Sequence, residues 1–159
     1  MRTWPADWES RKAGADCPMC AEGRPAETPF GIRFFEGEVS SGHLRRGHSQ
    51  RGYAFVLWRG RHVSEVTELS AVEAATYWDE LLAVARALET YYVPAKLNIL
   101  ILGNETPHLH AHIVPRYVDD RAPGRPLLEA DADRPPAADD DVRRDARALE
   151  RLLADAEPG

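Results

Sequence analysis

The segment that most constrains the fold of this chain is His108–Val114, His-Leu-His-Ala-His-Ile-Val, in which histidines alternate with apolar residues. Successive side chains of a β-strand point to opposite faces. A strand here would therefore project three imidazoles from one face and Leu109, Ala111 and Ile113 from the other. The alternation predicts a strand whose apolar face is buried.

Three imidazoles in a row suit a metal-binding ladder, an exposed polar edge or the lining of a pocket. The residues between them are all apolar, so the opposite face of the strand is expected to pack against a core. A strand that is held in this way and carries three imidazoles favours a pocket over an exposed edge.

Other short apolar runs predict further strands, at Ile32–Phe35, Tyr53–Trp58 and Leu97–Leu102. The turn Gly103–Pro107 joins the last of these to the histidine strand, so the two are expected to form an antiparallel hairpin. Residues 36–52 contain four glycines, three arginines and two histidines, and we interpret them as a loop.

One long helix is predicted to begin at Ser70, because Ser70 and Glu73 have the spacing of a capping box. Pro94 bounds the helix, which is expected to end at least one residue earlier. Its predicted apolar face consists of Val72, Ala75, Leu81, Leu82, Ala85 and Leu88.

The chain of 159 residues is long enough for one domain with a core. We expect an N-terminal arm over residues 1–16, the domain over 17–118 and a tail rich in proline and aspartate over 119–159. A possible helix at Val142–Ala154 would close the tail, with Leu149, Leu152 and Leu153 as its apolar contacts.

Charge and hydropathy exclude several classes of protein. The net charge of −6 argues against a protein that coats a nucleic acid polymer, although it permits a small phosphorylated ligand. No run approaches the roughly 18 apolar residues of a membrane span. The first residues lack the apolar region of a secretory signal, so we expect a cytoplasmic protein.

The two cysteines form Cys17-Pro-Met-Cys20. In a reducing compartment this spacing indicates a metal or redox pair more than a structural disulfide. A thioredoxin-like pair would follow an apolar strand, whereas this one follows a polar arm. No second such motif completes a four-cysteine zinc site, and two reduced cysteines without a metal are the remaining alternative.

The histidine segment resembles the motif of the histidine-triad (HIT) family, His-φ-His-φ-His-φ-φ, where φ is apolar, at every position from His108 to Val114. The flanks 102–110 and 114–117 are similar to the branch described as diadenosine-polyphosphate hydrolases. Gly52-Tyr53, 61–63 and 68–69 also match that branch, and the resemblance covers about residues 15–128. It implies an α+β fold, with an antiparallel sheet of about five strands and a long helix packed on it.

The resemblance also implies the chemistry. The middle histidine, His110, would attack the α-phosphorus of a nucleotide and form a nucleotidyl-histidine that water hydrolyses. The third, His112, would contact the scissile phosphate, and His108 completes the triad. Asn104 and Thr106 in the preceding turn would donate hydrogen bonds to the phosphate, with Asn104 as a plain turn residue after Gly103 the alternative. Arg116 would hold a phosphate or form an ion pair at the end of the strand.

Zinc-binding members of the family imply a ligand set of Cys17, Cys20, His62 and His108. His43 or His48 would be the alternative to His62. These two histidines, with Arg45, Arg46 and Arg51, would otherwise contact a distal phosphate or form a solvated surface. Family members commonly form homodimers, and Tyr77, Trp78, Tyr91 and Tyr92 are available for an interface or for the core.

One departure concerns the ribose. Many family members carry an acidic residue that binds the ribose hydroxyls, and the corresponding stretch here offers Glu36 and Glu38 without a clear alignment. The predicted function is hydrolysis of dinucleoside polyphosphates or nucleoside phosphoramidates. A nucleotidylyltransferase or phosphorylase that uses the same intermediate, and a non-catalytic zinc-stabilised nucleotide-binding module, are the alternatives.

Overall fold

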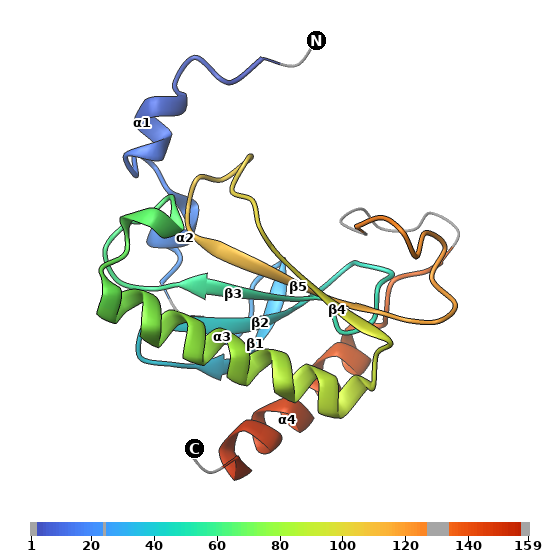
Figure 1. Ribbon diagram of the computed structural model, residues 1–159. Helices are drawn as coiled ribbons and strands as arrows, with labels where there is room; N and C mark the ends of the chain where they lie inside the picture. Colours follow the sequence, from blue (N-terminus) through green and yellow to red (C-terminus); the bar gives the residue numbers. More distant parts are fainter. Residues whose placement is uncertain (1–2, 24, 127–133, 157–159) are drawn as a thin grey trace.

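The computed structural model describes residues 3–23, 25–126 and 134–156. Five strands form one antiparallel sheet in the order β1-β2-β3-β5-β4 (Figure 1). The strands are β1 (Gly31–Glu36), β2 (Ser40–Arg45), β3 (Ala54–Trp58), β4 (Lys96–Ile101) and β5 (His110–Arg116). The helices are α1 (Trp8–Lys12), α2 (Pro18–Ala21), the 3-10 helix η1 (Val66–Glu68), α3 (Ala71–Tyr92) and α4 (Asp139–Asp155). The predicted α+β class and the hairpin of β4 and β5 are confirmed.

Helix α3 lies across one face of the sheet (Figure 1). The predicted capping box is present: Glu73 N donates to Ser70 Oγ at 3.2 Å, and Ser70 N donates to the Glu73 carboxylate at 2.8 Å. The helix ends at Tyr92, and the next residue, Val93, adopts a left-handed conformation with φ of 47°. The predicted apolar face is partly wrong, because Val72, Ala75 and Leu82 are exposed. The buried face of α3 consists of Tyr77, Leu81, Val84, Ala85, Ala87, Leu88 and Tyr92.

Strand β2 occupies a stretch that the sequence predicts as a loop, and that prediction is wrong. Gly42 lies in the middle of β2, where a Cβ atom would lie 3.0 Å from Phe35 Cβ and 3.3 Å from Val84 Cγ2. The glycine therefore allows α3 to pack closely against the sheet. Glycine is a residue type typical of turns, but Gly42 lies inside a strand, where its lack of a side chain allows close packing.

A bulge between Arg33 and Phe35 interrupts the register of β1 with β2. The extra residue lets both Phe34 and Phe35 pack against the core, although neighbouring side chains of a regular strand would point apart. After the bulge, Glu36 pairs with Ser41. The bulge therefore increases the apolar surface that β1 presents to the helices.

Helix α4 begins three residues before the predicted start, and it belongs to the same core as the sheet. Val142, Ala146 and Leu149 are buried with residues of β1 and α3, so the packed unit extends beyond the predicted boundary at residue 118. Residues 127–133 of the predicted tail lie outside the described residues.

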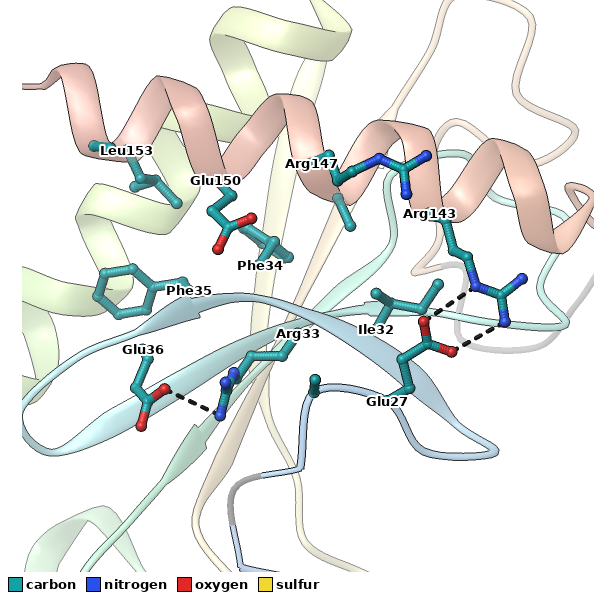
Figure 2. A pocket seen from close by; sticks show the side chains of 13 residues that line it. Glu27, Ile32, Arg33, Phe34, Phe35, Glu36, Arg143, Arg147, Glu150 and Leu153 are labelled. Atoms are coloured by element: carbon teal, nitrogen blue, oxygen red, sulfur yellow. Dashed lines mark hydrogen bonds and ion pairs between the residues drawn. The ribbon is translucent and has the colours of Figure 1, made fainter.

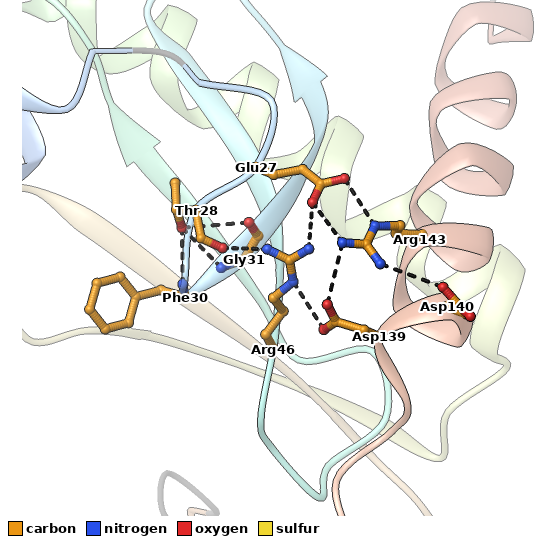
Figure 3. Close-up of polar contacts among 8 residues, drawn as sticks. All are labelled: Glu27, Thr28, Phe30, Gly31, Arg46, Asp139, Asp140 and Arg143. Atoms are coloured by element: carbon orange, nitrogen blue, oxygen red, sulfur yellow. Dashed lines mark hydrogen bonds and ion pairs between the residues drawn. The ribbon is translucent and has the colours of Figure 1, made fainter.

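Ion pairs attach the start of α4 to the sheet. Glu27 accepts hydrogen bonds from Arg46, which follows β2, and from Arg143 of α4, as Figure 3 shows. Asp139 also pairs with Arg46 and Arg143. These hydrogen bonds to two guanidinium groups lower the pKa of Glu27 to about 2.

The two faces of the sheet differ. Ala111 and Ile113 of β5 and Val56 of β3 point into the core beneath α3. His110 and His112 alternate with these core residues and therefore project from the opposite face. No helix within the described residues is both long enough and apolar enough to span a membrane.

Candidate functional site

The face of the sheet opposite α3, called the histidine face below, is built from cross-strand rows. One row runs across all five strands through directly paired residues: Arg33, His43, Phe55, His112 and Leu100. The next row contains Ser41, Leu57 and His110. The rings of His110 and His112 are 4.8 Å apart, and Phe55 lies 5.2 Å from His112. Two imidazoles thus lie beside an aromatic ring on a rigid sheet.

The hydrogen bond of His110 defines which of its ring nitrogens is free. His110 Nδ1 lies 2.7 Å from the carbonyl oxygen of His108, so Nδ1 carries the proton and donates it. The Nε2 atom is then left with its lone pair. Burial lowers the pKa of His110, so the ring is neutral and nucleophilic near pH 7.

His112 has the opposite arrangement. Its Nδ1 lies 2.8 Å from the hydroxyl of Tyr53. Burial raises the pKa of Tyr53, so the phenol keeps its proton and donates it to Nδ1. The Nε2 atom of His112 therefore carries a proton. Burial, followed by the charges of His110 and Arg45, lowers the pKa of His112 to about 4, so this neutral ring is a hydrogen-bond donor at Nε2.

The two neighbouring imidazoles are therefore complementary. His110 offers a lone pair, and His112 offers an N–H group. A nucleophile next to a fixed donor is the arrangement that displacement at a phosphorus atom requires, since the donor stabilises the charge on the phosphoryl oxygens.

His108 belongs to a different group of side chains from His110 and His112. It precedes β5, and its ring lies 5.5 Å from the ring of His62. Its Nε2 donates to the carbonyl oxygen of Trp58 at 2.8 Å, which leaves the Nδ1 lone pair free. Burial lowers the pKa of His108 to about 4. The prediction that all three imidazoles line one pocket therefore needs correction, because His108 faces the cysteines.

Cys17, Cys20, His62 and His108 form a cluster whose ligand atoms all lie within 4.8 Å of one another. His108 Nδ1 is 3.4 Å from Cys17 Sγ and 3.5 Å from Cys20 Sγ, and His62 Nδ1 is 3.3 Å from Cys20 Sγ. Tetrahedral zinc with ordinary Zn–S and Zn–N bonds separates neighbouring donors by about 3.3–3.8 Å. The contact distances therefore fit a zinc ion.

The orientation of the second histidine also fits a metal. His62 Nε2 donates to the carbonyl oxygen of Lys12 at 3.2 Å, so its Nδ1 lone pair points to Cys20. Fixing one ring nitrogen on a backbone carbonyl is how proteins orient histidine ligands. His43 and His48, the alternatives to His62, contact Ser41 and Gln50 instead.

The turn before β5 places Asn104 and Thr106 differently. Asn104 is exposed at the turn, and Thr106 is half-buried. Thr106 lines a small cavity of about 140 Å³ together with Arg11 and Cys17, beside the N-terminal arm. Hydrogen bonding between these two side chains and a phosphate stays a prediction.

The side chain of Arg116 is enclosed by other residues of the chain and does not face an open pocket. Its guanidinium is buried and forms an ion pair with Asp120. It also donates to Asn98 Oδ1 and to the carbonyl oxygens of Ala122 and Arg125, each at 2.7 Å. These contacts hold the loop after β5. Of the two predicted roles of Arg116, the ion pair is therefore correct and the phosphate contact is wrong.

A cavity of about 510 Å³ lies between β1 and α4, away from the histidines (Figure 2). Its apolar wall includes Phe34, Phe35 and Leu153. Charged groups at its rim pair with each other, as Arg33 does with Glu36. No imidazole is among its lining residues, so this cavity is not the candidate active site.

Sequence reasoning missed Tyr53 and Phe55 as parts of the histidine face, and it named Arg45 only as a loop residue that would contact a distal phosphate or form a solvated surface. Tyr53 and Phe55 lie in a run predicted only as a buried strand, and Arg45 lies in the presumed loop. Their period-two spacing, at positions 53 and 55, is a signal that both side chains share a face. Only the register with β5 shows that this face is that of the histidines.

Comparison with known proteins agrees with this geometry. Residues 46–119 match the family model described as the HIT domain. A histidine triad protein of Bradyrhizobium japonicum is 27% identical and superposes with a TM-score of 0.70, over 77% of this chain and 90% of that chain. A search of curated proteins gives no match.

Two more distant structures share the fold. A zinc-bound histidine triad family protein of Mycobacterium smegmatis is 24% identical, with a TM-score of 0.63 over 92% of this chain and 99% of that chain. The diadenosine triphosphate hydrolase of Plasmodium falciparum is 13% identical, with a TM-score of 0.57 over 85% of this chain and 89% of that chain.

Proposed function

We propose that this chain, which carries a HIT domain, is a nucleotide hydrolase that cleaves the bond between the α-phosphate and a leaving group. Its substrates would be dinucleoside polyphosphates or nucleoside phosphoramidates. The single observation that carries the proposal is the complementary pair on the histidine face, a lone pair on His110 Nε2 beside a proton on His112 Nε2.

In the first step, His110 Nε2 attacks the α-phosphorus. A P–N bond forms, and the leaving group departs with the electron pair of its bond to phosphorus, taking a proton from water where it is an amine. His110 keeps its Nδ1 proton, so the nucleotidyl-histidine ring is cationic. The carbonyl oxygen of His108, 2.7 Å from Nδ1, stabilises this charge.

In the second step, water attacks the same phosphorus and the P–N bond breaks. The electron pair returns to His110 Nε2, the nucleoside monophosphate leaves and the proton lost by water goes to solvent. His112 Nε2–H donates to a phosphoryl oxygen in both steps, held in place by Tyr53. Dividing one displacement into two easier ones is the advantage of the covalent intermediate.

We also propose that zinc binds Cys17, Cys20, His62 and His108. The donor distances and the orientation of both histidines support this proposal, as does the zinc-bound relative of 24% identity. When bound, zinc would supply structural cross-linking between the N-terminal arm and the segment before β5. Because His110 directly follows that segment, the cross-link would orient the nucleophile.

The remaining parts of the proposal concern assembly and location. We propose a homodimer through α3 and the edge strand β4, supported by the exposed apolar residues Trp78, Leu82 and Ile99. A cytoplasmic location is supported by the two free cysteines, since thiols stay reduced there.

Intact-protein mass spectrometry after brief mixing with a nucleotide tests the mechanism. We would mix diadenosine tetraphosphate, and separately adenosine 5′-phosphoramidate, with the wild type and with His110→Ala. A transient adduct of nucleotide mass on the wild type alone, lost in mild acid as a P–N bond is, supports the proposal. Nucleotide binding without adduct or turnover would instead indicate the non-catalytic module.

A second experiment separates the hydrolase from the transferase alternatives. Turnover is followed with and without added inorganic phosphate or a sugar phosphate. A hydrolase releases the same nucleoside monophosphate in both cases. A new nucleotide product that appears only with the acceptor would assign the intermediate to a transferase or phosphorylase.

A further inference from the structure

Arg45 of β2 lies on the histidine face with its guanidinium directed at aromatic rings. Its Cζ atom is 4.8 Å from the ring centre of Tyr53 and 5.6 Å from that of Phe55. Phe55 in turn lies 5.2 Å from the ring of His112. One aromatic ring therefore separates the cation from the triad.

The charge of Arg45 is available to a ligand. Among the described residues, no carboxylate forms an ion pair with it, whereas Arg46, the next residue, pairs with Glu27 and Asp139. The side chain of Arg45 is half-buried. One N–H group of the guanidinium bonds the Tyr53 hydroxyl, and its other donors are left for an anion, with which a partly desolvated guanidinium interacts more strongly than a solvated one.

His43 provides a second donor on the same face, two residues before Arg45. Its side chain is 4% exposed, and its Nε2 lies 3.0 Å from Ser41 Oγ. Arg59 Nε donates to that Oγ at 2.8 Å, and no other described group accepts the proton of this buried hydroxyl, so Ser41 donates to His43 Nε2. His43 Nδ1 therefore carries a proton, and no described residue accepts it.

Arg45 and His43 lie at a distance from His112 that suits a second anionic group on the same substrate. His43 and His112 are separated by one intervening strand, β3, which corresponds to about 10 Å between backbones at the usual strand spacing. A phosphorylated nucleotide is long enough to reach across it. The positive charge of Arg45 contrasts with the net charge of −6 of the whole chain, as expected where a surface attracts an anion.

From these contacts we propose that Arg45 and His43 form a second phosphate subsite, so that the preferred substrates carry another phosphate besides the scissile one. The proposal rests on the proposed nucleotide function. The second phosphate would come either from the phosphate chain or from a phosphorylated ribose. Arg45 would bind two of its oxygens through the guanidinium fork, and His43 Nδ1 would donate to it.

Equilibrium binding measured by calorimetry distinguishes the two sources. AMP is the reference with one phosphate, α,β-methylene ADP carries the second phosphate in the chain, and adenosine 3′,5′-bisphosphate carries it on the ribose. We expect one of the two bisphosphates to bind the wild type roughly tenfold tighter than AMP, as charge-assisted hydrogen bonds allow. The tighter one identifies the source.

The variants then test the residues. Arg45→Gln should abolish the advantage over AMP, and Arg45→Lys, which keeps the charge but not the fork, should restore part of it. His43→Phe should reduce it to a smaller extent. Arg86→Gln is the matched control, since Arg86 is exposed on α3 across the sheet, and it should keep the full advantage.

Two results would overturn the subsite: equal affinity of the wild type for all three ligands, or an Arg45→Gln variant that weakens AMP as much as the bisphosphates. The proposed function fails separately. A chain with the Arg45-dependent advantage but no covalent adduct would keep the subsite and lose the hydrolase, whereas an adduct without the advantage would do the reverse. A wild type that binds none of the nucleotides would overturn both.

Discussion

The hydroxyl of Tyr53 lies 2.8 Å from Nδ1 of His112 and thereby places the proton of that imidazole on Nε2. Tyr53 is the residue immediately before β3, and its side chain is buried beneath Arg45 and next to His48. The tautomer of a histidine on one strand is therefore determined by a neighbouring element. Catalysis in the proposed mechanism depends on this contact, because it makes Nε2 of His112 a donor toward the phosphate.

Replacing Tyr53 with Phe should lower kcat for nucleotide hydrolysis by roughly tenfold, the equivalent of one lost hydrogen bond. Without the hydroxyl, Nδ1 and Nε2 of His112 compete for the proton, so fewer molecules present Nε2–H to the phosphate. KM should change less than kcat, which steady-state kinetics would show.

Tyr91→Phe is the control for this variant, because the Tyr91 hydroxyl also donates a hydrogen bond but to Asp145, on α4. Its turnover below the unfolding temperature should match the wild type. Equal kcat values for Tyr53→Phe and the wild type would show that the Tyr53 contact does not position His112.

Zinc content is the second prediction. Metal analysis of protein purified without added metal should give about one zinc per chain, as a single four-ligand site requires. Cys20→Ser and His62→Asn should lose the metal, and a chelator should lower the Tm of the wild type by removing the cross-link to the N-terminal arm.

His43→Asn should retain the full zinc content, because His43 contacts Ser41 and not the cysteines. If His43→Asn lost its zinc and His62→Asn kept it, His43 and not His62 would be the zinc ligand. A metal-free wild type would contradict the zinc proposal altogether.

The third prediction concerns the attachment of α4. The buried carboxylate of Asp145 accepts the hydroxyl protons of Tyr91 and Tyr92, at 2.8 and 2.9 Å. Asp145→Asn keeps the volume but replaces one acceptor oxygen by a donor that faces a phenol. We expect a loss of about 1–3 kcal/mol in the free energy of unfolding, measured by denaturant titration. Asp79→Asn, at an exposed position of α3, should leave it within about 0.5 kcal/mol of the wild type.

Local patterns predicted the parts of the structure that local chemistry determines. The alternation in His108–Val114 predicted a strand with a buried apolar face, because period two depends only on neighbouring residues. Ser70 and Glu73 predicted the start of α3, because a capping box closes within four residues. Cys17, Cys20, His62 and His108 were grouped by the family resemblance, since no local spacing joins residues 62 and 108.

Features that depend on distant partners were missed. Gly42 indicated a loop because its role, the close approach of Val84 on α3, is invisible until the two elements pack. The separate direction of His108 depends on the carbonyl of Trp58, which binds Nε2 and turns the ring toward the cysteines. Arg45 was one of several loop arginines until the register of β2 placed it beside Phe55.

The pH dependence of stability is the fourth prediction. Burial, followed by the charges of Arg59 and Arg33, lowers the pKa of His43 from 6.5 to about 4. Between these values the unfolded chain binds a proton at this site and the folded chain does not, so stability rises with pH in this window. The contribution is present above pH 6.5 and is lost as pH falls toward 4, amounting to about 3 kcal/mol at most.

The measurement is the free energy of unfolding at several pH values for the wild type and for His43→Asn. The variant should show a shallower slope between pH 4 and 6.5, although its stability at pH 7 will also differ through the lost contact with Ser41. Glu27, whose pKa is lowered from 4.5 to about 2, also makes stability rise with pH, but only below pH 4.5, so its window lies mostly below that of His43. Identical slopes would contradict a proton-free His43 in the folded chain.

The last prediction concerns the homodimer. Trp78 and Leu82 lie one helical turn apart on α3, and each is 39% exposed; Ile99 on the edge strand β4 is 38% exposed. A second copy would bury these apolar side chains and pair the free edge of β4. Light scattering coupled to gel filtration should give twice the chain mass of 17.8 kDa. Ile99→Lys should shift it to the monomer, because a charge on the edge opposes pairing. Phe30→Lys, at another exposed apolar residue before β1, should remain dimeric, and a monomeric wild type would refute the interface.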